Sequence, residues 1–204
     1  MRKRLATYNV AVATTLMLFS SLCIAASSQV LDEFSAMYKQ EWGVTQPCKN
    51  TRLNRKSVCS AVLRSEGNAP FVLQHDTPSK KVAVLIHGLS DSPFFMREIA
   101  NILYDEGFDV LVPLLPGHGL RDASDDMSDS DLAERWQAHI DDVLNLANSV
   151  ADTVIVGGFS TGGALAVEHY LDTDTGVDGL MLFSGALALS ENAESRSRIW
   201  GIKW

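Results

Sequence analysis

Residues 153–171 read TVIVGGFSTGGALAVEHYL, and this stretch decides the fold. Its apolar start predicts a buried strand over Thr153–Val156, and the pattern that follows predicts a helix over Gly162–Leu171. The turn between them contains the motif G-x-S-x-G, from Gly158 to Gly162. A serine nucleophile needs such a sharp strand-to-helix turn, because its hydroxyl group must stand clear of bulky neighbours. We therefore predict that Ser160 is a nucleophile.

Apolar runs alternate with helix-period segments on both sides of this turn, from Lys80 onward. The predicted strands are Lys81–Ile86, Asp109–Leu115 and Gly179–Phe183, and the predicted helices are Pro93–Asp105 and Leu132–Val150. The strands are apolar on both faces, which is typical of a parallel sheet covered by helices on both sides. The predicted fold class is therefore α/β, with a doubly wound, mostly parallel sheet.

The composition is that of one globular domain. The chain has 204 residues, of which 46% are hydrophobic and 21% are charged. We expect three segments: a signal peptide over 1–26, an N-terminal helix and leading segment over 27–79, and the α/β domain over 80–204. Within the leading segment, the spacing of apolar residues predicts an amphipathic helix over Val30–Trp42.

The first 26 residues have the pattern of a secretory signal. Three basic residues at positions 2–4 precede an apolar run over Leu5–Ile24, and small residues follow at positions 25–27. Signal peptidase cleaves after such a pattern, so we expect an exported protein, periplasmic or secreted. The alternative is an uncleaved segment that anchors the protein in a membrane.

The charge balance argues against nucleic acid as a partner. The chain has 17 Lys and Arg against 25 Asp and Glu, a net charge of −8. Removal of the signal peptide takes away three basic residues and no acidic ones, which brings the net charge to −11. A chain of this charge is repelled by phosphate backbones and by anionic membrane surfaces.

Cysteines and clustered aspartates bear on disulfides and metals. The chain has three cysteines, Cys23, Cys48 and Cys59, and their spacing is not that of zinc ligands. In an oxidising compartment we predict a disulfide between Cys48 and Cys59, with two buried free thiols as the alternative. The aspartates of residues 122–131 lack the glycine and the closing glutamate of a calcium-binding loop. We expect a solvated acidic loop there, no metal and no cofactor.

Two backbone N–H groups are expected to face Ser160. Thr161 begins the helix behind the serine, where the positive end of the helix dipole favours a negatively charged oxygen. The strand Lys81–Ile86 runs into His87-Gly88-Leu89, and Gly88 lets the chain turn inward. We predict that the N–H groups of Leu89 and Thr161 form an oxyanion hole. His87 is interpreted as a loop-orienting or core residue rather than a base.

A third motif, Pro116-Gly117-His118-Gly119, follows the strand that ends at Leu115, and we expect His118 to shape a loop beside the pocket. In this order, the three motifs resemble the α/β-hydrolase superfamily over residues 80–187. Within it, the chain resembles the monoacylglycerol lipases, lysophospholipases and serine-aminopeptidase-like carboxylesterases. The resemblance implies an α/β-hydrolase fold, Ser160 as the nucleophile, and Leu89 and Thr161 as oxyanion donors.

The acid and the histidine of the catalytic triad are not found at the positions that the resemblance implies. In α/β-hydrolases both follow the serine along the chain. The histidine after Ser160 is His169, about two and a half helical turns away, which cannot take the serine proton. Asp172, Asp174 and Asp178 are interpreted as helix-end and turn residues. We therefore expect an incomplete form of the fold, without its last strands and its lid.

Two hypotheses remain open for the function. In the first, the chain is an incomplete exported serine hydrolase that acts on carboxylic esters, small molecules with an apolar acyl group such as a fatty-acyl chain. In the second, it is a non-catalytic protein that keeps the fold and the pocket for binding or interaction. In both, Gly179–Phe183 is left as an open apolar edge, and we expect an aggregation-prone chain.

Overall fold

The structure is a computed structural model that describes residues 29–49, 54–172 and 175–187. Its strands are β1 (Gln46–Pro47), β2 (Arg55–Cys59), β3 (Phe71–Leu73), β4 (Lys81–Ile86), β5 (Asp109–Val112), β6 (Thr153–Phe159) and β7 (Gly179–Phe183). Its helices are α2 (Lys39–Trp42), α3 (Arg97–Asp105), α4 (Ser124–Met127), α5 (Leu132–Val150) and α6 (Thr161–Leu171), with 3₁₀ turns η1 (Glu66–Asn68) and η2 (Pro93–Met96). Residues 29–36 form a further helix before α2. The predicted signal peptide lies outside the described residues.

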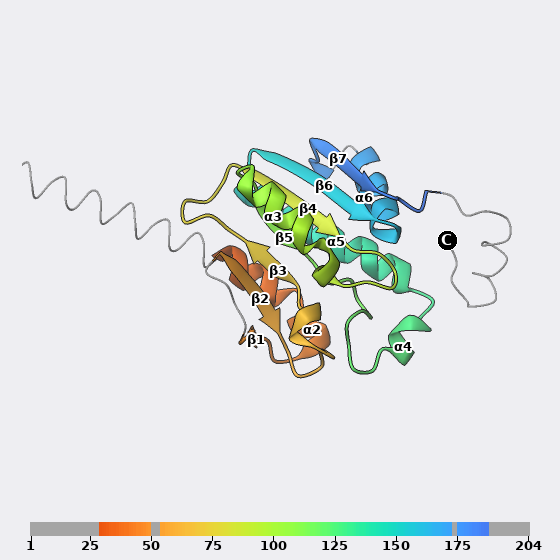
Figure 1. Cartoon of the computed structure of the whole chain (residues 1–204). Coiled ribbons are helices and arrows are strands. Elements are labelled where there is room, and N and C mark those ends of the chain that lie inside the picture. Colours follow the sequence, from red (N-terminus) through yellow and green to blue (C-terminus); the bar gives the residue numbers. More distant parts are fainter. Residues whose placement is uncertain (1–28, 50–53, 173–174, 188–204) are drawn as a thin grey trace, which may run out of the picture.

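The strands form one sheet, in the order β1-β2-β3-β5-β4-β6-β7 (Figure 1). The strands β5, β4, β6 and β7 are parallel to one another, whereas β1, β2 and β3 pair antiparallel. The predicted α/β fold with a mostly parallel sheet is thus confirmed. The antiparallel strands lie outside the prediction, since β1 has 2 residues and β3 has 3, too few for a periodic signal.

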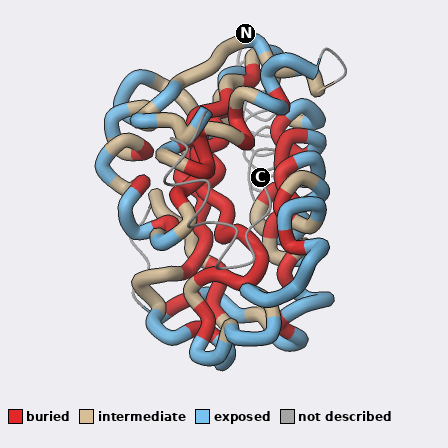
Figure 2. Tube along the Cα trace, turned by 90° about the vertical axis from the view of Figure 1, so that its right-hand side faces the viewer, coloured by how far each residue is buried: buried red, intermediate tan, exposed pale blue. Residues whose placement is uncertain are grey.

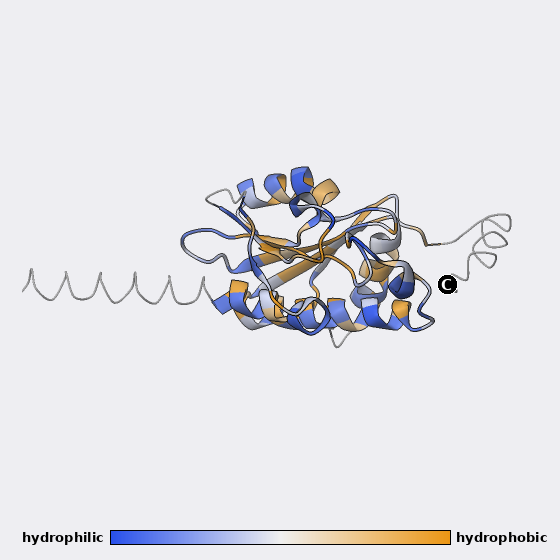
Figure 3. Ribbon diagram, turned by 90° about the horizontal axis from the view of Figure 1, so that it is seen from below, coloured by the Kyte–Doolittle hydropathy of each residue, from blue (hydrophilic) through white to orange (hydrophobic). Residues whose placement is uncertain are grey.

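Helices cover both faces of the sheet (Figure 3). The helices α5 and α6 pack on one face together with the helix of residues 29–36, and α3 packs on the other. Along β4, Val82, Val84 and Ile86 face the first layer, and Ala83 and Leu85 face α3. A strand buried on both faces is apolar at nearly every position, because its side chains alternate between the faces. Figure 2 shows the buried residues gathered between the layers.

Local chemistry explains where several elements begin and end. The strand β5 ends at Val112 rather than at Leu115, because Pro113 has no N–H group to donate to the sheet. The strand β6 continues past Val156 because it pairs with β7 as far as Phe159. The predicted helix over 93–105 begins as η2 and continues as α3, whereas β4, α5 and β7 have the predicted bounds.

The predicted N-terminal helix is confirmed, with a break at residues 37 and 38. Val30, Phe34, Tyr38 and Trp42 are four residues apart along the chain, and all four are buried. This spacing places them on one face of a helix. The hydroxyl group of Tyr38 accepts the N–H of Leu114 at 3.0 Å, which fastens the N-terminal segment to the loop after β5.

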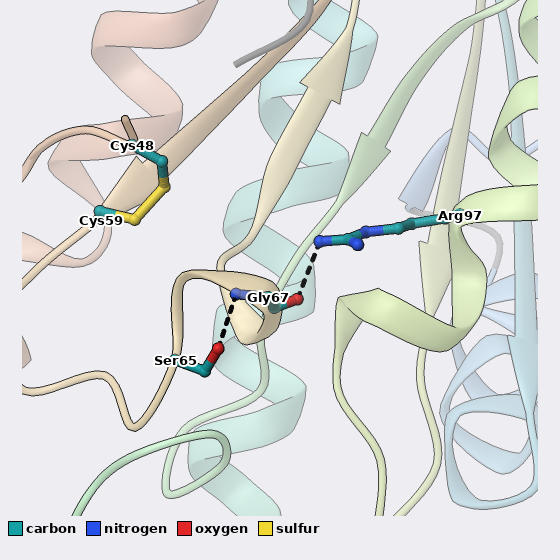
Figure 4. The surroundings of a disulfide bond; sticks show 5 residues. All are labelled: Cys48, Cys59, Ser65, Gly67 and Arg97. Atoms are coloured by element: carbon teal, nitrogen blue, oxygen red, sulfur yellow. Dashed lines mark hydrogen bonds between the residues drawn. A yellow bond between two sulfur atoms is a disulfide. The ribbon is translucent and has the colours of Figure 1, made fainter. Parts of the chain in front are cut away.

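A disulfide joins Cys48 and Cys59, the predicted pair. It connects the residue after β1 to the last residue of β2 (Figure 4). In the same region Arg97, at the start of α3, donates to the carbonyl oxygen of Gly67 at 3.0 Å. The antiparallel strands and η1 are therefore tied by contacts between residues that lie apart in the sequence.

The strand β7 is the outermost strand of the described sheet, and it is less buried than β4 or β6. Its apolar side chains are only partly covered by the described residues. Among the described helices, none combines the length and the apolarity that a membrane crossing requires.

Candidate active site

Ser160 stands at the junction of β6 and α6. It caps α6 with φ 54° and ψ −116°, a region that residues other than glycine rarely adopt. Among the described residues other than glycine, Ser184 also has a positive φ. Such a backbone persists where the surrounding structure imposes it, and it is typical of the sharp turn that carries a serine nucleophile. The structure thus contains the strand, turn and helix that the motif around Ser160 predicts.

Gly158 and Gly162 allow the strand and the helix to approach closely at this turn. A Cβ atom on Gly158 would overlap the carbonyl group of Gly162. A Cβ atom on Gly162 would overlap the carbonyl oxygens of Ile86 and His87. These neighbours are backbone atoms, which cannot move aside as a flexible side chain can. The glycines are therefore required where the turn packs against the end of β4.

The end of β4 lies beside the turn that carries Ser160, because Ile86 pairs with Gly158 in the sheet. The chain then passes through Gly88, where a Cβ atom would lie 2.7 Å from the carboxylate of Asp91 and 3.1 Å from the ring of Phe159. The absence of a side chain at Gly88 thus lets the loop after β4 pass close to the turn before α6.

Two backbone N–H groups at this edge of the sheet have the properties of oxyanion donors. Thr161 is the first residue of α6, and N–H groups in the first turn have no partner inside the helix. Leu89 follows the Gly88 turn, and no acceptor for its N–H is found within the described ranges. Both groups remain candidates to bind a negatively charged oxygen near Ser160.

His87 is fully buried and hydrogen-bonded at both ring nitrogens. Its Nε2 accepts the N–H of Leu115 at 3.1 Å, so the proton lies on Nδ1, which donates to the carbonyl oxygen of Gly88 at 2.8 Å. Burial, followed by the neighbouring His118, lowers the pKa of His87 to about 3. His87 is thus a neutral residue that orients two loops, in agreement with its interpretation as a loop-orienting histidine.

His118 connects the loop after β5 to the loop after β4. Its Nε2 lies 2.8 Å from the carbonyl oxygen of Leu89, and its Nδ1 lies 3.0 Å from that of Pro116. The indole N–H of Trp136 also donates to Pro116, at 3.0 Å. These contacts agree with the predicted role of His118 in shaping a loop.

The other three histidines also have partners away from Ser160. His139 lies 3.2 Å from the hydroxyl group of Tyr38, and burial lowers its pKa to about 4. His169, on α6, lies 3.8 Å from Asp141, and burial lowers its pKa. His75 lies 2.7 Å from Asp109 at the start of β5. All five histidines of the chain are described, and in the described structure none is hydrogen-bonded to Ser160.

The described carboxylates after Ser160 do not approach it. Asp178 accepts the N–H of Val154 at 2.7 Å, at the start of β6, whereas Ser160 follows the end of β6. The backbone carbonyl of Asp172 accepts the hydroxyl group of Thr175 at 2.8 Å, as in a turn. Asp174 lies outside the described residues. These positions agree with the interpretation of the aspartates as turn residues.

The acidic segment 122–131 is held by one arginine. Arg135 on α5 lies 2.9 Å from Asp126, 3.2 Å from Asp129 and 3.8 Å from Glu41. Burial raises the pKa of Glu41, whose carboxylate also accepts the N–H of Gly117. No group of three or more potential metal ligands is found in the part of the chain that the structure describes. Arg135 thus connects the acidic segment to α5 and to the N-terminal segment.

The loop after β7 also holds the serine turn, a contact outside the sequence-based prediction. The N–H of Ser160 donates to the carbonyl of Phe183 at 3.1 Å, and the N–H of Ala186 donates to the carbonyl of Ser160 at 2.9 Å. A Cβ atom on Gly163 would lie 2.7 Å from the Cα of Gly185. The small residues of Ser184-Gly185-Ala186 directly after a predicted strand are the signal that could have indicated this contact.

The family model described as "Alpha/beta hydrolase family" matches residues 83–201, more than half of the chain. The chain belongs to the alpha/beta hydrolase family. A curated relative, the thermostable monoacylglycerol lipase of Bacillus sp. (strain H-257), is 30% identical to it over 92 residues. The match covers 44% of this chain and 36% of that protein.

Solved structures agree with this family. One reported under "LipS and LipT, two metagenome-derived lipolytic enzymes" matches with a TM-score of 0.57 and 26% identity, over 66% of this chain and 51% of that one. The monoacylglycerol lipase of Paleococcus ferrophilus matches with a TM-score of 0.50 and 20% identity, over 65% of this chain and 51% of that one, which supports the fold alone. This alpha/beta hydrolase chain therefore spans about half, or less, of the length of these relatives. The resemblance to the monoacylglycerol lipase branch is confirmed.

Proposed function

We propose that this alpha/beta hydrolase chain carries the nucleophile and the oxyanion hole of a serine hydrolase that acts on carboxylic esters. The observation that carries the proposal is the backbone of Ser160, with φ 54° at a strand-to-helix turn and the first-turn N–H groups of α6 directly behind it. Such a backbone costs conformational free energy in a residue other than glycine. A serine nucleophile of acyl transfer requires this turn, because the turn holds its hydroxyl group clear of bulky neighbours.

In the proposed reaction, Oγ of Ser160 attacks the carbonyl carbon of the ester. The carbonyl oxygen becomes negatively charged and is bound by the N–H groups of Leu89 and Thr161. A general base takes the serine proton and passes it to the alcohol oxygen as the ester C–O bond breaks. Water then attacks the acyl-enzyme, which releases the carboxylic acid and restores the serine.

None of the five histidines is placed to act as the general base, because each has a partner other than Ser160. General base catalysis typically contributes about a hundredfold to ten-thousandfold in rate. We therefore expect slow ester hydrolysis by the 204-residue chain alone.

An apolar acyl group is the proposed recognition element of the substrate. Phe159, next to Ser160 in the chain, is 39% exposed. An exposed aromatic side chain near a nucleophile favours an apolar group over a charged one. The names of two relatives, a monoacylglycerol lipase and lipolytic enzymes, support the same substrate class.

Export to the periplasm or the medium is also proposed. The basic and apolar pattern of residues 1–26 supports it. The disulfide between Cys48 and Cys59 supports it as well, because disulfides persist in oxidising compartments. Retention of the N-terminal segment as a membrane anchor is the alternative.

A non-catalytic binding role is the second candidate function. It is favoured by the engagement of every histidine elsewhere, and in particular by the burial of both nitrogens of His87 in backbone hydrogen bonds. In this case the fold would serve binding, and Ser160 would not be a nucleophile in practice.

Labelling with a fluorophosphonate, read by intact-mass spectrometry, distinguishes the two functions. We expect slow labelling of the purified chain, faster labelling when imidazole is added as an external base, and none in Ser160→Ala. The matched control is Ser149→Ala, which removes a serine hydroxyl group that donates to the carbonyl of Leu146 in α5, and this variant should label like the parent. Absence of labelling even with imidazole would favour the non-catalytic role. Fast labelling without imidazole would show that a residue of this chain acts as the base.

A further inference from the structure

The loops after β4 and β5 are each hydrogen-bonded by a histidine from the other loop. His87, from the end of β4, accepts the N–H of Leu115 in the loop after β5. His118, from the loop after β5, lies within hydrogen-bond distance of the carbonyl of Leu89 in the loop after β4. The two rings are 5.0 Å apart and inclined by 64°. Each loop is therefore held by a side chain from the other, and both side chains are buried.

These histidines hold the two peptide groups that flank Leu89. His87 donates to the carbonyl oxygen of Gly88, which belongs to the same peptide group as the N–H of Leu89. His118 binds the carbonyl oxygen of Leu89, which belongs to the next peptide group. Because a peptide group is planar and trans, a bond to its carbonyl oxygen also directs its N–H. Fixing both groups leaves the Leu89 N–H little freedom to turn.

The contact with the Leu89 carbonyl requires a hydrogen on Nε2 of His118. Both ring nitrogens face carbonyl oxygens, which only accept, so a neutral imidazole can donate to one of them. Pro116 already accepts the indole N–H of Trp136. For the Leu89 carbonyl, His118 is the donor that the described structure provides, at the shorter distance of 2.8 Å.

We propose that His118 is a positioning residue of the oxyanion hole: its Nε2–H holds the Leu89 carbonyl and fixes the peptide group after Leu89, while His87 holds the peptide group before it, so that the Leu89 N–H between them stays directed at the developing oxyanion. The proposal rests on the proposed function, because it assumes that the Leu89 N–H binds the oxygen of an ester undergoing cleavage. His118 touches no reacting atom, since both of its nitrogens are directed at backbone carbonyls.

Three substitutions separate the contributions of the ring and of its two nitrogens. His118→Gln places an amide nitrogen near the position of Nε2 and can keep the bond to Leu89. His118→Asn reaches only the position of Nδ1 and can keep the bond to Pro116. His118→Phe keeps the ring and neither bond. His139→Phe is the matched control, because it removes another buried histidine, whose partner is Tyr38 and not the Leu89 loop.

The first readout is the rate of fluorophosphonate labelling at Ser160 in the presence of imidazole. We expect His118→Phe and His118→Asn to slow labelling by about tenfold to a hundredfold, since loss of an oxyanion donor costs about a hundredfold or more. His118→Gln and His139→Phe should stay within about threefold of the parent. Labelling of His118→Phe at the parent rate, or equal slowing of His118→Gln and His118→Phe, would overturn the proposal.

The second readout does not depend on reactivity. Hydrogen–deuterium exchange of the peptide 87–92 reports on this loop, in which the N–H of Asp91 donates to the carbonyl of Gly88 at 3.1 Å. Faster exchange in His118→Phe and His118→Asn, but not in His118→Gln, supports the positioning role, whether or not the parent chain is labelled. Absence of labelling in the parent chain would refute only the proposed function. Unchanged exchange in all three variants overturns the positioning role.

Discussion

The two edges of the sheet are covered in different ways. At one edge, β1 has 2 residues, includes Pro47 and is tied to β2 by the disulfide between Cys48 and Cys59. At the other edge of the described sheet, β7 presents Gly179–Phe183, 5 apolar residues without a proline or a charge. Short edge strands and prolines prevent pairing with further strands. Within the described residues, the sheet is therefore protected at the β1 edge, whereas no further strand covers β7.

Because of this difference, we expect the two edges to affect different properties: the stability of the single chain and its self-association. The β1 edge contains the disulfide, and the N-terminal segment that precedes β1 contains Tyr38, the partner of His139 on α5; both contacts act on the free energy of unfolding. The β7 side contributes a partly exposed apolar strand, which acts on contacts between molecules. Changes on the first side should alter the stability of the single chain, and changes on the second its tendency to associate.

The largest expected effect is that of the disulfide. Replacing both Cys48 and Cys59 by serine should lower the free energy of unfolding by about 3 kcal/mol, because the cross-link restricts the unfolded chain. The two cysteines are 11 residues apart. Urea unfolding followed by circular dichroism measures the loss, and a reductant should produce the same loss in the parent but none in the double variant. An unchanged urea midpoint would contradict a stabilising role for the β1 edge.

A smaller effect is expected from acid. Burial lowers the pKa of His139 to about 4, so between pH 6.5 and 4 the unfolded chain binds a proton that the folded chain does not. Stability must therefore fall as the pH falls, by about 2 kcal/mol from His139 alone between pH 7 and pH 5. Urea unfolding at a series of pH values should show a shallower dependence for His139→Gln than for the parent. Parallel curves for the two proteins would mean that His139 is not buried as a neutral ring.

The smallest effect on stability, and the clearest on association, is expected at β7. Leu182→Lys places a charge on an exposed position of the edge strand, which opposes pairing between edges. We expect less self-association by light scattering and a change of within about 0.5 kcal/mol in the free energy of unfolding. The control is Ile102→Lys on α3, a more exposed apolar position away from the edge, which should leave association unchanged. Equal effects of the two substitutions would show that the β7 edge is not the surface responsible.

The sequence predicts the parts of the fold whose signals lie within one element. The strands β4 and β7 and the helix α5 have their predicted bounds, because each is an apolar or amphipathic run of sufficient length. The antiparallel strands and α4 carry no such signal, since they are short and their pairing or packing depends on distant residues. The loop after β7 carries a local signal in its small residues, Ser184-Gly185-Ala186, but its bonds to Ser160 depend on the pairing of β7 with β6.

By itself, the sequence determined the alternation of strands and helices and the sharp turn at Ser160. Helical and strand periods and the need for glycine at a crowded turn act between residues close in the chain, so they can be recognised locally. Only the tertiary structure decided the partners of the histidines: His87 and Leu115 are 28 residues apart, His118 and Leu89 are 29 apart, and His139 and Tyr38 are 101 apart. These bonds form because the sheet brings the ends of β4 and β5 together and the N-terminal helix packs against α5. No local pattern contains that information.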